Sequence, residues 1–441
     1  MKGEYQMKIR LLSAMIALVM LLSVCALADQ PATVGDANLT GTVKFVAAYN
    51  ASQGMGDMIA AFNELYPNVT VELTTISNNT EGNLRIDTSL LAGGEIDVLL
   101  SYTSTYTRER TDAGFFMDLT DMIAAEGIDM NDEWGGAITV NDRIYCIPVD
   151  GLNYYIAINM DLWEKAGMGD IPTSWTMDEY AEACRALTAD GIFGGTESHG
   201  GEHWMNHVYQ AFGSDMRYTA DGKGVTYVSN PAFVETLQRQ VALEEEGVWY
   251  PWNEMKAAGL QTQNVFLGKE VATTITNNVT RFIADQANYP IDFKVAFAPY
   301  PKLSASDEHN YMEGPSKYGH LAITNTCENV EAAWAFVKFF AREGNVYLVK
   351  AGHLPTWRYT DRDKAVTLLF GSDEEAAKLV DVDTYKSVVL NLDGENYYDT
   401  FVNTEIDNYL ASVVKEVLNY ELDPVEAMAD VEEFAVGVLN K

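Results

Sequence analysis

Residues 42–73 read TVKFVAAYNASQGMGDMIAAFNELYPNVTVEL, and the pattern of their apolar residues changes twice. Val43 to Ala48 is rich in residues that favour strands. From Ile59 to Tyr66 the apolar residues recur at helical spacing, Pro67 stops that helix, and Val69 to Leu73 alternates as a second strand. A strand, a helix and a strand in this order predict the start of a parallel sheet.

The same pattern continues further along the chain. A helical segment near Leu84 to Leu91 is followed by the turn Gly93-Gly94 and by the apolar strand Ile96 to Leu100. Strands that alternate with helices in this way predict an α/β fold, with a largely parallel sheet and helices on both faces. Two strand-like runs on either side of Pro148 and Gly151 then indicate the first crossing to a second lobe.

Capping residues mark the helices in the middle of the chain. Thr176 and Glu179 form a capping box, which predicts a helix from about Tyr180 onward. Asn230-Pro231 supplies a cap and a first-turn proline for a later helix that Gly247 ends. The middle of the chain is therefore predicted to be mainly helical.

Strand patterns resume at Val271 to Thr276 and at Phe293 to Ala298, before a strongly apolar helix at Ala332 to Phe340. We take this resumption as a return to the first lobe. The sequence then predicts two interwoven α/β lobes around a hinge, with boundaries as follows: lobe 1, residues 29–147 plus 271–324; lobe 2, residues 148–270 plus 325–441.

The N-terminus has the features of a secretory signal peptide. Met7-Lys8-Ile9-Arg10 precedes the apolar run Leu11 to Val24, and Ala26-Leu27-Ala28 places small residues before a cleavage point. The apolar run is too short to span a bilayer. We therefore expect export and cleavage after Ala28, so that the protein works outside the cytoplasm. The alternative is a lipoprotein anchored through Cys25, although Val24 stands where that signal prefers Gly, Ala or Ser.

Cleavage would leave 441 − 28 = 413 residues, too many for a single core. It would also remove three basic residues and one acidic residue, so the net charge would move from −35 to −37. So large an acidic excess repels a phosphate backbone, so nucleic acid is not an expected partner. Cys146, Cys184 and Cys327 have no close spacing and are expected to be buried, free thiols.

Several motifs resemble those of the bacterial extracellular solute-binding proteins of family 1, over roughly residues 40 to 440. The matching segments are Asp57 to Phe62 before Tyr66-Pro67-Asn68-Val69, Leu91 to Val98, Ile144 to Pro148 with Tyr154 to Asn159, Trp163 to Gly167, Ile171 to Trp175, and Phe266 to Lys269. The resemblance implies two α/β lobes joined by a hinge, a carbohydrate bound in the cleft, and delivery to the permease of an ABC importer. Thr276-Asn277-Asn278 departs from the pattern, because many members carry an aromatic residue there.

The residues themselves also favour a binding protein. Open α/β sheets bind ligands at the carboxyl ends of their strands, and sugars need aromatic faces together with paired polar groups. Candidates on such loops are Tyr49, Asn50, Ser101, Tyr102, Asp150, Tyr154, Asn277, Asn278 and Tyr318, with Trp204 and Trp357 as candidates for stacking on a sugar ring. This mixture of aromatic and polar residues suits a neutral oligosaccharide. We also expect the protein to be a monomer and to need no cofactor. The alternative for Trp204 is a core tryptophan.

Two other chemistries have weaker support. His203 and His207 share a helix face near His199, but no His-Glu-x-x-His motif occurs, so no metal site is predicted. The acidic runs Glu244-Glu245-Glu246 and Asp373-Glu374-Glu375 are expected to be solvated helix faces. A secreted glycan hydrolase remains an alternative function, because paired carboxylates can hydrolyse glycosides. A ligand-sensing receptor component is the other alternative.

The first prediction concerns the N-terminus. We expect N-terminal sequencing of protein from the native host to begin at Asp29, because Ala26-Leu27-Ala28 places the cleavage point there. A diacylated Cys25, seen by intact mass, would contradict simple cleavage.

Overall fold

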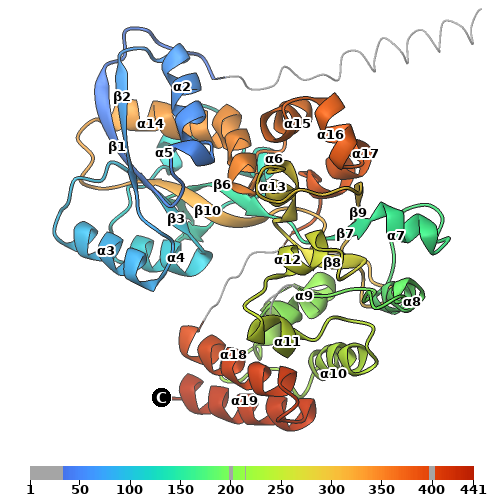
Figure 1. Ribbon diagram of the computed structural model, residues 1–441. Coiled ribbons are helices and arrows are strands. Elements are labelled where there is room, and N and C mark those ends of the chain that lie inside the picture. The colour runs from blue at the N-terminus through green and yellow to red at the C-terminus, as the bar shows by residue number, and fades with distance from the viewer. Residues whose placement is uncertain (1–32, 198–201, 214, 397–402) are drawn as a thin grey trace, which may run out of the picture.

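The computed structural model describes residues 33–197, 202–213, 215–396 and 403–441. They form two α/β lobes, each with its own sheet (Figure 1), which confirms the predicted fold class. Residues 1–28, and with them the predicted signal peptide, lie outside the described residues. No helix in the described part of the chain is long and apolar enough to cross a membrane.

The first lobe contains a six-stranded sheet in the order β11-β6-β10-β3-β1-β2. Its strands are β1 (Gly41–Ala47), β2 (Val69–Thr75), β3 (Val98–Tyr102), β6 (Ile147–Leu152), β10 (Ser316–Ile323) and β11 (Leu354–Pro355). As predicted, β1, β2 and β3 are parallel. The sheet is nevertheless mixed, because β10 runs antiparallel to both β3 and β6 and β11 runs antiparallel to β6.

Helices cover both faces of this sheet. They are η1 (Ala51–Gln53), α2 (Met55–Leu65), α3 (Thr80–Leu91), α4 (Ser104–Asp112), α5 (Thr120–Ala125), α6 (Met130–Trp134), α14 (Val330–Phe339), η4 (Phe340–Gly344) and η5 (Asn345–Ala351). A short hairpin joins β4 (Thr139–Val140) to β5 (Arg143–Ile144). Its two turn residues, Asn141 and Asp142, both have positive φ, which short polar side chains tolerate better than most.

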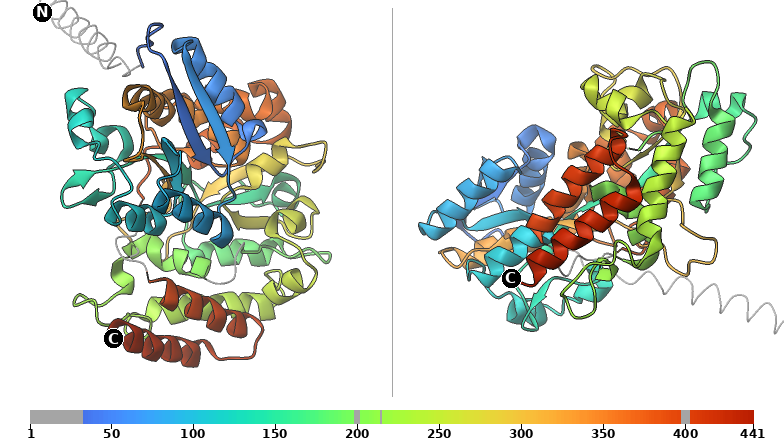
Figure 2. Two further views of the ribbon diagram at one scale, coloured as in Figure 1. Left: turned by 90° about the vertical axis from the view of Figure 1, so that its left-hand side faces the viewer. Right: turned by 90° about the horizontal axis from the view of Figure 1, so that it is seen from below.

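The second lobe is built on the antiparallel three-stranded sheet β8-β7-β9. Its strands are β7 (Tyr155–Asn159), β8 (Thr273–Thr276) and β9 (Val295–Pro299). Its helices are α7 (Met160–Lys165), α8 (Met177–Leu187), η2 (Glu202–Met205), α9 (Asn206–Phe212), η3 (Asp215–Arg217), α10 (Pro231–Glu245), α11 (Trp252–Ala257), α12 (Thr262–Leu267), α13 (Val279–Ala284), α15 (Arg362–Phe370), α16 (Asp373–Leu379), α17 (Val382–Thr384), η6 (Tyr385–Val389), α18 (Thr404–Leu418) and α19 (Pro424–Leu439). Helices α18 and α19 lie side by side at the far end of this lobe (Figure 2).

The structure corrects the predicted lobe boundaries. Strands β8 and β9 pair with β7, so residues 271–299 belong with the second sheet and do not return to the first lobe. Conversely, α14 packs on the first sheet, where the Phe336 ring centroid lies 5.1 Å from that of Phe45 (Figure 1). The error arose because a strand pattern shows that a segment pairs but not which sheet it joins.

The first crossing between the lobes lies slightly later than predicted. Pro148 and Gly151 both lie inside β6, and the chain passes to β7 through Asn153 and Tyr154. Asn153 is buried, and its side-chain amide donates to the carbonyl of Val388 at 2.8 Å. A second crossing joins β9 to β10. The lobes are therefore connected by at least two segments, residues 153–154 and residues 300–315, as expected for a hinge.

The predicted helix caps are present. Thr176 accepts from the Glu179 amide at 3.2 Å, while the Glu179 carboxylate accepts from the Thr176 amide at 2.7 Å. Asn230 caps α10, and Pro231 is its first residue.

The predicted solvated face at Glu244 to Glu246 is wrong for one residue. Glu245 and Glu246 are exposed, as are Asp373 to Glu375, but Glu244 is buried against the C-terminal helices. Gln240 donates to its carboxylate at 3.0 Å and the Tyr420 hydroxyl donates at 3.1 Å. Burial raises the pKa of Glu244 to about 7. Successive residues of a helix point in different directions, so one residue of an acidic run can face the core while its neighbours face solvent. The run alone does not show which residue this is.

The second prediction is that Glu244 makes stability fall as the pH rises. The pKa of Glu244 is about 7 in the folded protein and about 4.5 in the unfolded chain. Its contribution to stability is therefore complete below pH 4.5 and is lost as the pH rises to about 7. Glu244→Gln should remove this dependence. The difference between wild-type and variant unfolding free energies should change by about 3 kcal/mol between pH 4.5 and 8, in urea titrations. Glu245→Gln is the exposed control, and equal pH slopes for Glu244→Gln and wild type would contradict the assignment.

Candidate functional site

Four strands of the first lobe end, or begin, at the same edge of the sheet. Parallel β1 and β3 have their carboxyl ends there, β10 begins there because it is antiparallel, and β6 ends there. Tyr102, Gly319 and Asp150 stand in register across three of these strands. A Cβ on Gly319 would lie only 2.7 Å from the Cβ of Asp150, so glycine leaves the space that the carboxylate occupies. This topology brings together candidate residues that are far apart in the sequence.

Asp150 is the centre of the arrangement. It is fully buried, with an exposed fraction of 0%, and the described residues offer it no lysine or arginine as an ion-pair partner. The Tyr49 hydroxyl donates to Oδ2 at 2.9 Å, and Nδ1 of His353 lies 2.7 Å from Oδ1. The buried carboxylate therefore depends on one phenol and one imidazole for its hydrogen bonds.

Three tyrosines and one histidine form what we call the aromatic cluster: Tyr49, Tyr102, Tyr318 and His353. Ring centroids of Tyr49 and Tyr102 are 5.7 Å apart, those of Tyr102 and Tyr318 are 5.7 Å apart, and His353 lies 5.0 Å from Tyr49 and 5.7 Å from Tyr318. Burial, and then the nearby Asp150 charge, raise the pKa of Tyr49 and Tyr102 well above the ordinary value and that of Tyr318 to about 12. All three phenols therefore stay neutral, and Tyr49 donates its proton to Asp150.

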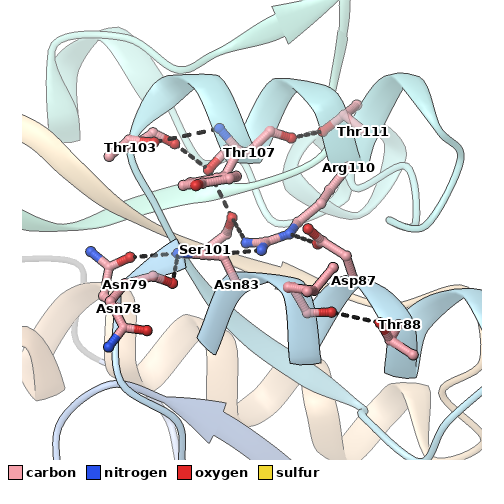
Figure 3. A network of polar contacts seen from close by, with 12 residues as sticks. Asn78, Asn79, Asn83, Asp87, Thr88, Ser101, Thr103, Thr107, Arg110 and Thr111 are labelled. Atoms are coloured by element: carbon pink, nitrogen blue, oxygen red, sulfur yellow. Dashed lines mark hydrogen bonds and ion pairs between the residues drawn. The ribbon is translucent and has the colours of Figure 1, made fainter. Parts of the chain in front are cut away.

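A buried polar network supports the cluster from α3 and α4 (Figure 3). Arg110 is 3% exposed, and its guanidinium donates to Ser101 at 2.9 Å, Asn83 at 2.8 Å and Asp87 at 2.8 Å. Asn83 then donates to Asn78 at 3.0 Å, and Asn78 donates to the Tyr318 hydroxyl at 2.8 Å. The predicted loop residue Ser101 thus supports the site from beneath, and this network fixes one ring of the aromatic cluster.

Thr103 adds local strain at the same edge. Its backbone has φ 59 and ψ 148, a region that residues with a Cβ rarely adopt. Its amide donates to the Tyr318 carbonyl at 2.7 Å, and its side chain caps α4. Such a conformation costs about 1 to 3 kcal/mol and is often found beside binding sites. Here it lets the chain turn sharply after Tyr102.

The remaining loop candidates lie around this edge or on the second lobe. Asn50 is exposed next to Tyr49, and its side-chain oxygen caps η1. Asn277 and Asn278 follow β8 and lead into α13. Tyr154 lies in the first crossing, 6.4 Å from the ring of Tyr300. The structure brings Tyr49, Tyr102, Asp150 and Tyr318 together and leaves these four further out.

The two tryptophan candidates lie in the cores of their lobes. Trp204 is 0% exposed and packs edge-on against Phe233, with centroids 6.0 Å apart. Trp357 is 4% exposed, and its indole donates to Glu133 at 2.9 Å, which also binds Arg342. An indole without an exposed face cannot stack on a sugar in this conformation. Their burial favours the core alternative for Trp204 and gives Trp357 a packing role as well, and stacking stays an untested prediction for both.

Of the three histidines considered as metal ligands, the structure describes the side chain of His207. His199 and the side chain of His203 lie outside the described residues. His207 is buried between Glu197, at 3.1 Å, and the Tyr300 hydroxyl, at 2.9 Å. Among the residues whose side chains are described, no group of three ligands could hold a metal.

Sequence reasoning missed His353 and the Arg110 network. His353 follows Gly352 and precedes the short strand β11, and nothing in its neighbours marks it as part of a site. In the sequence, Arg110 is one of several charged residues on a polar helix. Its role depends on contacts with Asn83 and Asp87 of α3, which the sequence does not show. Gly352 comes directly before His353 and Pro355 two residues after it, a pattern that indicates a turn and not a site.

Comparison with known proteins gives the site its context. The profile of the bacterial extracellular solute-binding protein family matches residues 49–347, more than half of the chain. Among solved structures, a sugar transporter from Rhizobium etli in an open conformation is 17% identical, with 89% of this chain and 99% of that chain covered and a TM-score of 0.70.

Two further structures carry a bound sugar. A substrate-binding protein from Listeria monocytogenes in complex with cycloalternan is 17% identical, covers 90% of this chain and 98% of its own, and has a TM-score of 0.67. Maltose-bound MalE3 of T. maritima is 19% identical, covers 90% and 99%, and has a TM-score of 0.66. At these identities the structural matches establish the fold.

Proposed function

The chain belongs to the bacterial extracellular solute-binding proteins, and on that premise we propose that it captures a carbohydrate between its lobes and delivers it to an ABC importer. The ligand that suits the site best is a neutral oligosaccharide. The observation that carries the proposal is the aromatic cluster around the buried carboxylate of Asp150, at the edge where the chain crosses to the second lobe.

The chemistry of this edge matches that of a sugar. Sugar rings have apolar faces that pack on aromatic rings, and hydroxyls that both donate and accept. Tyr318 and His353 are partly accessible, His353 with 17% of its side chain exposed, while Tyr49 and Tyr102 are buried in the same cluster. The Asp150 carboxylate fixes the orientation of Tyr49 and His353. A site of this kind is arranged before the ligand arrives, which lowers the entropy cost of binding.

The proposal extends to location and partners. The family is extracellular, and we propose that this chain acts outside the cytoplasm after cleavage at Ala28, with a lipid anchor on Cys25 as the alternative. The other expected partner is the permease of the importer, with the binding protein acting as a monomer. The acidic surface, with a net charge of −35, keeps such copies apart in solution.

A glycan hydrolase and a sensory receptor component are the alternatives. The family is one of binding proteins, so we propose that the chain has no enzymatic activity of its own. Incubation with chromogenic glycosides and oligosaccharides should therefore release no product. Neighbouring permease genes in the source genome would favour transport over sensing.

The third prediction tests the binding site. Calorimetric titration with maltose, maltotriose, cellobiose and cycloalternan should find a ligand for the wild type. Tyr318→Ala should weaken that ligand by about 10- to 100-fold, because Tyr318 is the half-buried tyrosine of the cluster and an aromatic contact contributes about 1 to 3 kcal/mol. Tyr49→Phe should also weaken it, because the phenol can no longer bridge to Asp150.

The matched control is Tyr409→Ala, a half-buried tyrosine on α18 that stacks on Phe434 far along the second lobe. It should bind like the wild type. Unchanged affinity in Tyr318→Ala, with a folded variant by its melting curve, would exclude the aromatic cluster as the ligand site.

The fourth prediction is lobe closure. Proteins built from two lobes around a hinge close as rigid bodies when the ligand contacts both. Small-angle scattering at saturating ligand should give a smaller radius of gyration than the free protein. The same radius in both states would contradict closure even if binding itself is confirmed.

A further inference from the structure

Helix α13 brings one residue of the second lobe against the first lobe. Arg281 lies on this helix, and its side chain packs directly on Gly352, the residue before His353. A Cβ on Gly352 would lie 2.6 Å from Cδ of Arg281 and 3.3 Å from its Nε. Gly352 also has a φ of 84, so glycine is required there for the backbone as well as for the contact. Arg281 is thus placed beside the aromatic cluster.

Among the residues that the structure describes, none accepts a hydrogen bond from the guanidinium of Arg281. Its Nε is buried without a hydrogen bond, and the residue forms no ion pair. The buried arginines Arg110, Arg217 and Arg342 each bind a carboxylate. Among the described arginines that are not exposed, Arg281 is the one without a partner. An unpaired, partly buried cation is costly, which indicates that an acceptor is supplied from outside the chain.

The surroundings of Arg281 orient this cation toward the first lobe. Its Cζ lies 4.4 Å from the ring centroid of Phe282, so one face of the guanidinium is covered while its N–H edge stays available. Burial lowers the pKa of Arg281. Its contact with Gly352 places the side chain beside His353, at the edge that presents Asp150 and the phenols.

We propose that Arg281 is a ligand-binding residue of the second lobe, whose guanidinium donates two hydrogen bonds to adjacent hydroxyl oxygens of a neutral sugar held on the aromatic cluster. The inference rests on the proposed function. A planar fork of donors fits two oxygens on neighbouring ring carbons, which is the pattern of a pyranose with free vicinal hydroxyls. The net charge of −35 disfavours an anionic ligand.

This assignment also explains how a ligand could favour closure. The aromatic cluster belongs to the first lobe and Arg281 to the second, so a sugar that contacts both links the lobes. The unpaired guanidinium gains its acceptors only when the sugar lies between them. The free energy of that pairing then contributes to the closed state and not to the open one.

The test compares variants of Arg281 in calorimetric titrations with maltose, maltotriose, cellobiose and cycloalternan. Arg281→Gln should weaken the sugar that the wild type binds by about 10- to 100-fold. Arg281→Lys should weaken it as well, because an ammonium is a point charge without a planar fork. The matched control is Arg85→Gln, since Arg85 also has no ion pair but is exposed on α3. It should bind like the wild type.

Two further readouts separate ligand contact from a structural role. Melting curves without ligand should place Arg281→Gln and Arg281→Lys within about 3 °C of the wild type, because the guanidinium forms neither a hydrogen bond nor an ion pair with the described residues. The penalty of Arg281→Gln should also shrink for a deoxy analogue of the bound sugar that lacks one of the two hydroxyls.

The outcomes are distinct. A wild type that binds none of the four sugars contradicts the proposed function and this inference with it. A wild type that binds, together with unchanged affinity in a folded Arg281→Gln, overturns the inference and leaves the proposed function in place. If Arg281→Gln melts much earlier, Arg281→Lys decides: unchanged affinity there overturns the proposal, and weaker binding with an unchanged melting temperature supports it.

Discussion

The buried carboxylate of Asp150 is the constraint on which this site depends. A charge removed from water needs partners, and here they are Tyr49 and His353, which reach it from a strand end and from the segment before β11. The sheet must therefore hold β1, β6 and β11 in fixed register, and Gly319 must leave the space between Tyr102 and Asp150 empty of side chain. Conversely, the carboxylate sets the orientation of the rings that line the edge. The hydrogen bonds from Tyr49 and His353 compensate for the desolvation of the carboxylate, and they also hold the two rings in place.

A second set of buried polar groups supports that edge, and it too contains a buried charge whose partners come from several elements. Arg110 binds Asp87, Asn83 and Ser101, and through Asn83 and Asn78 it reaches the hydroxyl of Tyr318. The network joins α3, α4 and β3 into one unit, because each of the three guanidinium nitrogens donates to a different residue. Satisfied networks of this kind rigidify a site, whereas a single missing partner would leave a buried charge. The strained backbone of Thr103 is tolerated in this rigid setting.

Local patterns in the sequence predicted much of the fold. The alternation from Val43 to Leu73, the capping box at Thr176 and the cap at Asn230 all depend on neighbours within a few residues, and all are present. Lobe membership depends on pairing across more than a hundred residues, as between Tyr155 and Thr276, and periodicity carries no information about it. The same limit applies to the site. Tyr49, Tyr102, Asp150 and Tyr318 follow from the rule about strand ends, but His353, Arg281 and the burial of Trp204 are set by contacts between distant segments.

The order of strands in the first sheet has a consequence for how the chain folds. Strand β10 lies between β3 and β6, yet it is made of residues 316–323, and the edge strand β11 comes later still, at residues 354 and 355. Until that part of the chain is available, β3 and β6 each present an open, apolar edge. Pairings that close such long loops form slowly, because the loss of chain entropy precedes the contacts that compensate for it. The N-terminal 300 residues therefore contain all three strands of the second sheet but only four of the six strands of the first, and a fragment cut before β10 would expose edges that invite aggregation. Completion of the first sheet thus waits for residues 316–355, whereas the second sheet is formed from residues that precede them.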